Sequence, residues 1–196
     1  MSAIDENIQA SIEEIMTSGY EYAANAFSGI TRQQVEVNGY ASMSLECNIT
    51  DQTNRHVNEL TVVRTDIVGE LAGSGYLVFN KAEFESIADM GLAVLGGSAS
   101  IDKPTVMKEI DNIISASVIT ELSEGLDIDV YGAVPQLFQL EHLDQLNERT
   151  LTSQTKDDCY LLFYNRFVFE GFMALSPLFI WEIDRKIIDL VGVQTT

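Results

Sequence analysis

An acid and an amide stand one helical turn apart in the segment Lys103–Glu124, and they are the strongest candidates for chemistry in this chain. Apolar residues recur there at helical spacing, which predicts an amphipathic helix with one face in the core. Opposite that face lies one column of side chains at positions i, i+4, i+7 and i+11: Thr105, Glu109, Asn112 and Ala116. The acid can bind a cation, and the amide both donates and accepts hydrogen bonds. The same pattern is also typical of a solvated helix face, so the column alone leaves both interpretations open.

The helix that carries this column has clear sequence signals. Its expected core arc, about half of the helix circumference, comprises Val106, Met107, Ile110, Ile113, Ile114, Val118 and Leu122. Pro104 is tolerated in a first turn, and Gly125 is expected to end the helix as a C-cap. An earlier helix, from about Ile4 to Ser28, is expected to end in the same way at Gly29.

The whole chain has the pattern of two similar halves. In the first half, the strand-like runs are Val35–Ile49, Leu60–Ile67 and Gly75–Phe79, followed by a helix over Ala82–Leu95. In the second half, they are Ile128–Leu140, Tyr160–Phe169 and Gly171–Leu175, with a polar loop at about 141–156 and a last helix over Leu178–Leu190. We therefore predict an α+β fold in which a helix, three strands and a helix are duplicated with pseudo-two-fold symmetry. The expected domain is single, residues 1–196, with halves of about 1–97 and 98–196; two unrelated α+β halves are the alternative.

The charge balance limits the class of partner. Thirty Asp and Glu residues against eleven Lys and Arg residues give a net charge of −19. This field repels phosphate backbones and anionic membrane surfaces, so we expect neither nucleic-acid binding nor membrane insertion. The apolar fraction of 46 % excludes a largely disordered chain.

Targeting and metal signals are weak throughout the sequence. The acidic N-terminus has no signal-peptide pattern, and the apolar window 161–181 is interrupted by charged residues and a proline. Cys47 and Cys159 are too far apart in sequence for a CxxC site, which suits a reducing cytosol. His56 and His142 have no metal-ligand spacing, and Gly96–Ser100 is typical of a linker. We expect a cytoplasmic protein without a metal site of its own.

The sequence around the column resembles that of a known family. The segment PTVMKEIDNIISASVITELSEGLDIDVYGAVPQL is similar to the CheC/CheX/FliY family of chemotaxis phosphatases. The family signature is an Asp or Ser, three residues, a Glu, two residues and an Asn on an exposed helix. Thr105, Glu109 and Asn112 match these positions, with Thr105 as a departure that keeps a hydroxyl. The later VPQL, Val134–Leu137, resembles the start of the family's following strand, and the duplicated fold is similar as well.

The resemblance implies dephosphorylation of a CheY-like response regulator in chemotaxis or two-component signalling. Asn112 would enter the receiver's pocket and orient the attacking water, and Glu109 would bind the receiver's lysine, with Thr105 in a supporting role. The phosphorylated receiver supplies the Mg²⁺, so no cofactor of this chain's own is expected. Asp111 stands where related sequences tend to have Gly, about 100° around the helix from Asn112, and is expected to add negative charge near the target.

The first helix offers a degenerate second site. Ninety-five positions before Glu109 and Asn112 lie Glu14 and Thr17, so the acid is retained and the amide is replaced by a shorter hydroxyl. We expect this half to be catalytically silent. One intact site resembles CheX more than two-site CheC, and by the same resemblance we expect a homodimer.

Two other functions remain open on the sequence. The first is a non-catalytic adaptor of the same fold that binds a signalling protein through the acidic surface. The second is a domain with unrelated ligands that shares only the α+β layout.

Overall fold

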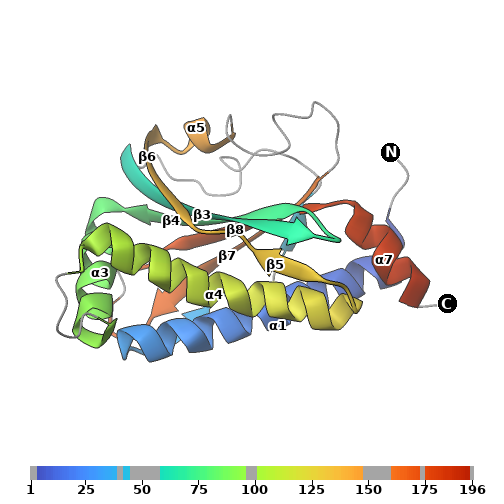
Figure 1. The fold of residues 1–196 in the computed structure, drawn as a ribbon, viewed down its shortest axis with the longest axis horizontal. Coiled ribbons are helices and arrows are strands. Elements are labelled where there is room, and N and C mark those ends of the chain that lie inside the picture. The colour runs from blue at the N-terminus through green and yellow to red at the C-terminus, as the bar shows by residue number, and fades with distance from the viewer. Residues whose placement is uncertain are drawn as a thin grey trace.

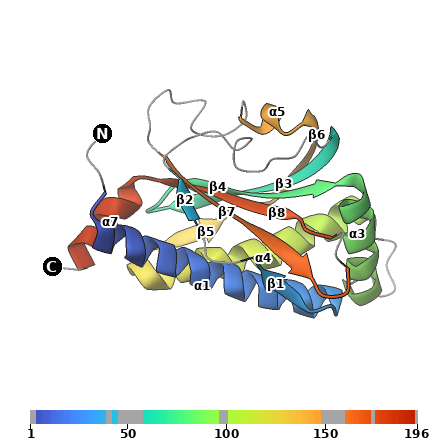
Figure 2. The ribbon, with the colours of Figure 1, turned by 180° about the vertical axis from the view of Figure 1, so that it is seen from behind.

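Two long helices lie side by side under one face of an antiparallel sheet (Figure 1). The computed structural model describes residues 4–38, 42–44, 58–95, 101–147, 160–172 and 175–194. The long helices are α1 (Glu6–Thr31) and α4 (Lys103–Leu126). They run antiparallel, because Gly19 lies against Val118 while Ile15 lies against Gly125. The shorter helices are α3 (Lys81–Leu95) and α7 (Lys186–Gln194) at the two ends and α5 (Asp144–Asn147) on the other side of the sheet (Figure 2).

The sheet contains eight strands in the described residues. They are β1 (Val35–Val37), β2 (Ser42–Ser44), β3 (Asn58–Gly69), β4 (Gly73–Asn80), β5 (Val130–Gly132), β6 (Gln136–His142), β7 (Tyr160–Phe169) and β8 (Leu178–Asp184). The order is β1-β7-β8-β4-β3-β5, with β2 also on β7 and β6 also on β3. Each long strand, β3 or β7, therefore pairs with the next strand of its own half and with the two short strands of the other half.

The short strands of each half thus pair with the long strand of the other half. This arrangement has pseudo-two-fold symmetry, which confirms the predicted duplication. The pair Leu60 and Asn80 of β3 and β4 becomes, after a shift of 102 positions, the observed pair Leu162 and Glu182 of β7 and β8. Leu77 and Phe179, which are themselves 102 positions apart, pair with each other where β4 meets β8. The pseudo-axis therefore passes through the centre of the sheet.

The two long helices are equivalent by a shift of 95 positions. That shift places buried residues of α1 on buried residues of α4; the matched pairs are Ile12 and Met107, Met16 and Asp111, Gly19 and Ile114, Tyr20 and Ser115, Ala23 and Val118, Ala24 and Ile119, Phe27 and Leu122, Thr31 and Leu126. Glu14 and Thr17 are therefore the structural counterparts of Glu109 and Asn112, as the sequence predicted.

The main core fills the space between the sheet and the helices. At its centre the ring of Phe179 packs edge-on against Tyr20 and Trp181 and at a tilt against Phe167, with ring centroids 5.4 to 5.5 Å apart. A second, smaller apolar cluster lies on the opposite face of the sheet and includes Val62, Tyr76 and Ile180. The sheet is thus covered on both faces, which explains the near-continuous apolar runs in its central strands.

The expected helix ends at Gly29 and Gly125 are wrong. Both helices continue through these glycines and end when Arg32 (φ 53°) and Asp127 (φ 52°) adopt the left-handed conformation. Gly29 has open space around it, and Gly125 packs against the side chain of Ile15. A glycine near a helix end indicates a cap only when its own backbone leaves the helix.

The last quarter of the chain also differs from its prediction. The expected helix over Leu178–Leu190 is instead strand β8 followed by helix α7, and the expected strand at Gly171–Leu175 begins with a turn in which Gly171 has φ 76°. The strand β8 lies between β4 and β7 and is buried on both faces, so its sequence has no alternation. A short apolar run of this kind does not distinguish a buried strand from a helix.

Two expected strands are interrupted, and some predictions fall outside the described residues. Ile128–Leu140 contains the separate strands β5 and β6, and Val35–Ile49 contains β1 and β2. Among the described residues, each half thus has four strands where three were predicted. Cys47, His56, Cys159 and the linker Gly96–Ser100 lie outside the described residues. Among the helices that are described, none is long and apolar enough to cross a bilayer.

Two glycine-to-alanine substitutions are expected to change stability in opposite directions. A Cβ at Gly75 would lie 2.8 Å from two ring atoms of the buried Trp181, so Gly75→Ala should lower the free energy of unfolding by about 1–3 kcal/mol. Gly29 is exposed within α1, and a Cβ added there would meet no other part of the protein within 4 Å, so Gly29→Ala should raise the free energy of unfolding by about 0.5–1 kcal/mol. Urea unfolding of both variants measures these changes. Equal effects would contradict the packing around Trp181.

Candidate functional site

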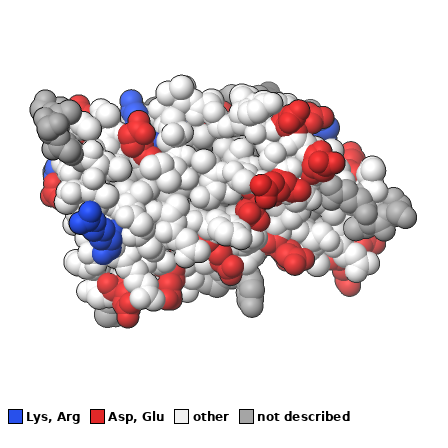
Figure 3. Space-filling view, turned by 60° about the horizontal axis from the view of Figure 1, so that its bottom comes forward, with Lys and Arg blue, Asp and Glu red and all other residues white. Residues whose placement is uncertain are grey.

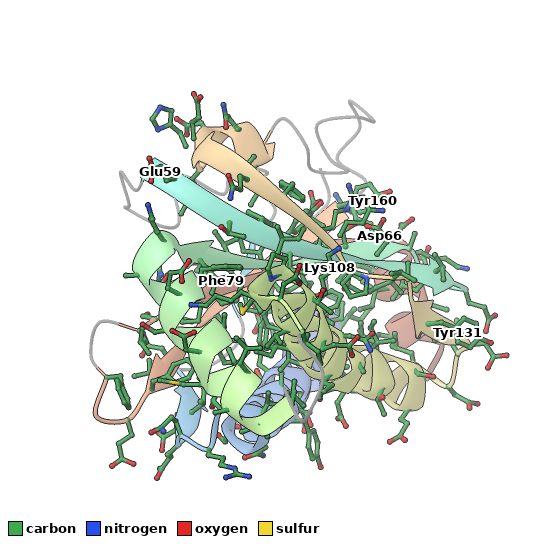
Figure 4. All side chains as sticks on the ribbon, turned by 60° about the vertical axis from the view of Figure 1, so that its left-hand side comes forward. Glu59, Asp66, Phe79, Lys108, Tyr131 and Tyr160 are labelled. Atoms are coloured by element: carbon green, nitrogen blue, oxygen red, sulfur yellow. The ribbon has the colours of Figure 1, made fainter. Side chains whose placement is uncertain are left out.

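The helix α4 is held firmly at both ends and along its length. Asp102 caps its N-terminus, because its side chain accepts a hydrogen bond from the Thr105 backbone N–H at 2.9 Å. Pro104 sits in the first turn, as predicted. In Figure 4, where Asp66 marks β3 and Lys108 marks α4, the helix lies beneath the strand. Contact with β3, β5, α1 and α3 leaves one side of α4 for solvent.

The four residues of the predicted column all lie on that solvent side. Thr105, Glu109, Asn112 and Ala116 are exposed. Within the described part of the chain, the side chains of Glu109 and Asn112 have no hydrogen-bond or ion-pair partner. The acid and the amide are therefore available to a partner and are one turn apart on a rigid element. An Asn112 bonded into its own fold would have had no such freedom.

The buried arc of α4 lacks one predicted residue, Ile113, and gains Ile119, Leu126 and two polar residues. Ile113, expected in the core, is 37 % exposed beside Asn112, whereas Asp111 and Ser115 are buried. The helical wheel correctly placed Asp111 away from the column. However, the expectation that Asp111 adds negative charge near the target is wrong, since its side chain points into the molecule toward β3.

Asp111 belongs to a buried polar cluster that the sequence analysis missed. Its Oδ2 accepts a hydrogen bond from Thr65 Oγ1 at 2.6 Å, and its Oδ1 accepts one from Ser115 Oγ at 3.4 Å. Burial raises the pKa of Asp111 to about 7, and the two hydroxyl donors oppose this rise only in part. The available signal was Thr65, a polar residue at an inward position of β3 between the buried Val63 and Ile67.

The degenerate site on α1 is less open than the column on α4. Glu14 is exposed, whereas Thr17 is half-buried. Ser18, next to Thr17, donates a hydrogen bond to Glu121 of α4 at 2.8 Å. The two helices are in close contact at this point, since a Cβ on Gly19 would lie 3.1 Å from the Val118 Cα. The structure thus places an acid and a short hydroxyl where α4 has an acid and an amide.

Acidic side chains surround the exposed helices. Figure 3 shows the molecule from the helix side, with Asp and Glu distributed around a broad uncharged area and few basic groups. Lys103, at the start of α4, forms ion pairs within the chain, because its Nζ lies 2.6 Å from both Glu85 and Asp89 of α3. The hydrogen bonds to Asp89 and Glu85 raise the pKa of Lys103. The field at the column is therefore acidic, which favours a partner that brings its own cations.

Two cavities among the described residues lie away from the column. One, of about 560 Å³, lies where α3 begins beside β3 and β6 and is lined by residues that include Glu59, Lys81 and Gln139. Another, of about 310 Å³, lies between α1 and β1. No group of three potential metal ligands occurs among the described residues. The column is a convex helix surface, which suits a macromolecular partner better than a small molecule.

Comparison with solved structures identifies the fold. No family model matches the sequence, and no curated protein matches it significantly. The structure is similar to FliY of Thermotoga maritima, with a TM-score of 0.70, 20 % identity and coverage of 97 % of this chain and 96 % of that one. It is also similar to the chemotaxis protein CheX of Desulfovibrio desulfuricans (TM-score 0.53, 15 % identity, 87 % and 97 % covered). A third similar structure is a chain of the FliM-SpeE complex of H. pylori (TM-score 0.61, 10 % identity, 97 % of each chain covered).

Proposed function

We propose that this chain, which has the fold of FliY, CheX and CheC-like chemotaxis proteins, acts in chemotaxis as a phosphatase of a phosphorylated CheY-like response regulator. The observation that carries the proposal is the pair Glu109 and Asn112. Both are exposed and without partners among the described residues, and they stand one turn apart on a helix that is capped and packed.

The proposed reaction requires this chain mainly to position the attacking water. Hydrolysis of an aspartyl phosphate joins a water oxygen to phosphorus, breaks the bond from phosphorus to the carboxylate oxygen, and yields inorganic phosphate and the free aspartate. The carboxamide oxygen of Asn112 would orient that water by accepting a hydrogen bond from one of its O–H groups. No strong base is required, because the transition state is largely dissociative and the receiver brings Mg²⁺ and a lysine.

Glu109 would hold the two proteins in register. A carboxylate one turn before Asn112 can form a charge-assisted bond with the receiver's lysine while the amide enters the pocket. Thr105, one turn further toward the helix N-terminus, stands where a supporting contact would form. The buried position of Asp111 supports this arrangement, since its charge is kept away from the anionic phosphoryl group.

An adaptor without catalysis is the second candidate. Its support is that similar structures include chains of the FliG-FliM and FliM-SpeE complexes, both from H. pylori. The same exposed column could bind a signalling protein through Glu109 without supplying a reacting water.

The test follows the decay of phosphoryl groups on receivers. CheY-like receivers from the same genome are phosphorylated with labelled acetyl phosphate, and the loss of label is timed with and without this protein. Accelerated loss from at least one receiver is the expected result. A receiver that binds without acceleration would replace the phosphatase with the adaptor. The absence of both binding and acceleration for every receiver would overturn the phosphatase and an adaptor that binds receivers.

A further inference from the structure

The carboxyl of Asp111 is buried directly behind the candidate site, and nothing in the proposed chemistry uses it. Asp111 precedes Asn112 in the chain and is fully buried, as are Thr65 and Ser115 to within 1 %. A hydrogen bond of 2.6 Å between Thr65 and Asp111 links this turn of α4 to β3. A buried carboxyl without an ion partner is costly, so its retention calls for a physical reason.

The pseudo-symmetry provides an internal comparison for this cluster. The shift of 95 positions between the helices places Met16 and Tyr20 at the positions of Asp111 and Ser115, and the shift of 102 between the strands places Phe167 at that of Thr65. All three counterparts are fully buried. The fold therefore accepts at the equivalent place two apolar residues and a tyrosine, whose hydroxyl donates to the Phe179 carbonyl at 3.3 Å and not to another member of the trio. The polar trio lies where the helix whose column retains the amide packs on the sheet, with Asp111 and Ser115 from the second half and Thr65 from the first.

We propose that Asp111 is a positioning residue: through Thr65 it sets how α4 sits on β3, and thereby where Glu109 and Asn112 stand toward a partner. This inference rests on the proposed function of the column. Apolar packing is non-directional, whereas a short hydrogen bond fixes both the rotation of a helix and its position along its axis. Since Asp111 lies between Glu109 and Asn112 on the helix, a small rotation at Asp111 moves both.

The same contact makes the position of the helix sensitive to pH. Thr65 from β3 and Ser115 from α4 are the polar groups that face Asp111, and both donate to its carboxyl oxygens. From α3, Gly91 contributes only apolar contact with Val106 and Ile110, and from β5, Gly132 faces Ile119 and Thr65. Among the described residues of α1, α3, β3, β5 and β6, no charged group affects the pKa of Asp111, which burial raises to about 7. The ionised carboxylate binds the two hydroxyls more tightly than the neutral acid does.

The test compares two substitutions of Asp111 with matched changes of Thr65. Asp111→Met introduces the residue of the other half, and Asp111→Asn keeps the shape and the acceptor but cannot ionise near neutral pH. Thr65→Val removes the donor, and Thr65→Ser keeps it. Circular dichroism and thermal unfolding first establish that each variant is folded.

With a receiver that the wild type dephosphorylates, Asp111→Met and Thr65→Val should lower kcat about ten-fold, since a displacement of about 1 Å can cost far more than that. Receiver binding should change by less than about three-fold, because an exposed ion pair such as that of Glu109 contributes little to affinity. The conservative variants Asp111→Asn and Thr65→Ser should each retain most of the wild-type kcat. The ratio of wild-type kcat to that of Asp111→Asn should rise as the pH increases through neutrality. A folded Asp111→Met variant with wild-type kcat and pH profile would overturn the inference.

A measurement without a receiver separates this inference from the proposed function. Residual dipolar couplings of the backbone N–H groups in α4 report its orientation against the sheet in the free protein. They should change between pH 5.5 and 8.5 in wild type and stay constant in Asp111→Asn. Constant couplings in wild type would overturn the inference even if the protein is a phosphatase. Changing couplings in a protein that no receiver responds to would overturn the proposed function alone.

Discussion

Replacement of Asn112 by alanine is expected to reduce the acceleration of receiver dephosphorylation by about 100-fold or more, the usual cost of removing one well-placed hydrogen-bonding group from a reacting centre. Alanine lacks the carboxamide that would orient the water. Asn112 is exposed and has no partner among the described residues, so its removal should leave the fold intact. The loss should therefore appear in kcat, while receiver binding stays within about three-fold.

A matched control for this substitution is Asn25→Ala. Asn25 is an exposed asparagine on α1, outside the column. We expect this control to retain wild-type dephosphorylation within about two-fold, as is usual for a surface position. Single-turnover decay of the labelled receiver measures both variants. If Asn112→Ala still accelerates decay as wild type does, the amide has no catalytic role, and the proposed mechanism is wrong.

The second large effect is a loss of stability with rising pH that originates in Asp111. Its pKa in the folded protein is raised from 3.8 to about 7 by burial. The folded state therefore holds the proton more tightly than the unfolded state, and the stability that comes from this proton is complete below pH 3.8 and lost as the pH rises to about 7. Between pH 5 and pH 8 the free energy of unfolding should fall by about 3 kcal/mol from this group alone.

The variant Asp111→Asn isolates this contribution. Asparagine keeps an oxygen that can accept the bond from Thr65 but has no proton to lose in this range. All other titrating groups are common to both proteins, so the difference between their unfolding free energies should grow with pH in favour of the variant. Urea unfolding from pH 5 to pH 8 measures the difference. A difference that is constant with pH would mean that Asp111 does not titrate in this window.

The column and the duplication could be predicted from the sequence because both depend on local periodicity. The side of α4 that carries Glu109 and Asn112 follows from 3.6 residues per turn, and the equivalence of Glu14 follows from a constant shift along two similar helices. The expected exposure of all four column residues is confirmed. The roles of Glu109 and Asn112, the CheY-like partner and the homodimer remain predictions.

The remaining features depend on contacts between residues far apart in the chain. Whether 178–184 is a strand or a helix was decided by its place between β4 and β7, because an apolar run buried on both faces carries no period. The ends of α1 and α4 were decided by the backbones of Arg32 and Asp127, after glycines that remain helical.

The environment of Asp111 also combines a feature that the sequence predicts with one that depends on tertiary contacts. Spacing alone placed it off the column, but only the packing of α4 on β3 brings it within 2.6 Å of Thr65, which lies 46 positions earlier in the chain. A helical wheel gives the direction of a side chain but not the groups that surround it. The pKa of a carboxyl depends on those surrounding groups. The sequence by itself therefore determined which residues of α4 face solvent, and the tertiary structure decided what holds them in position.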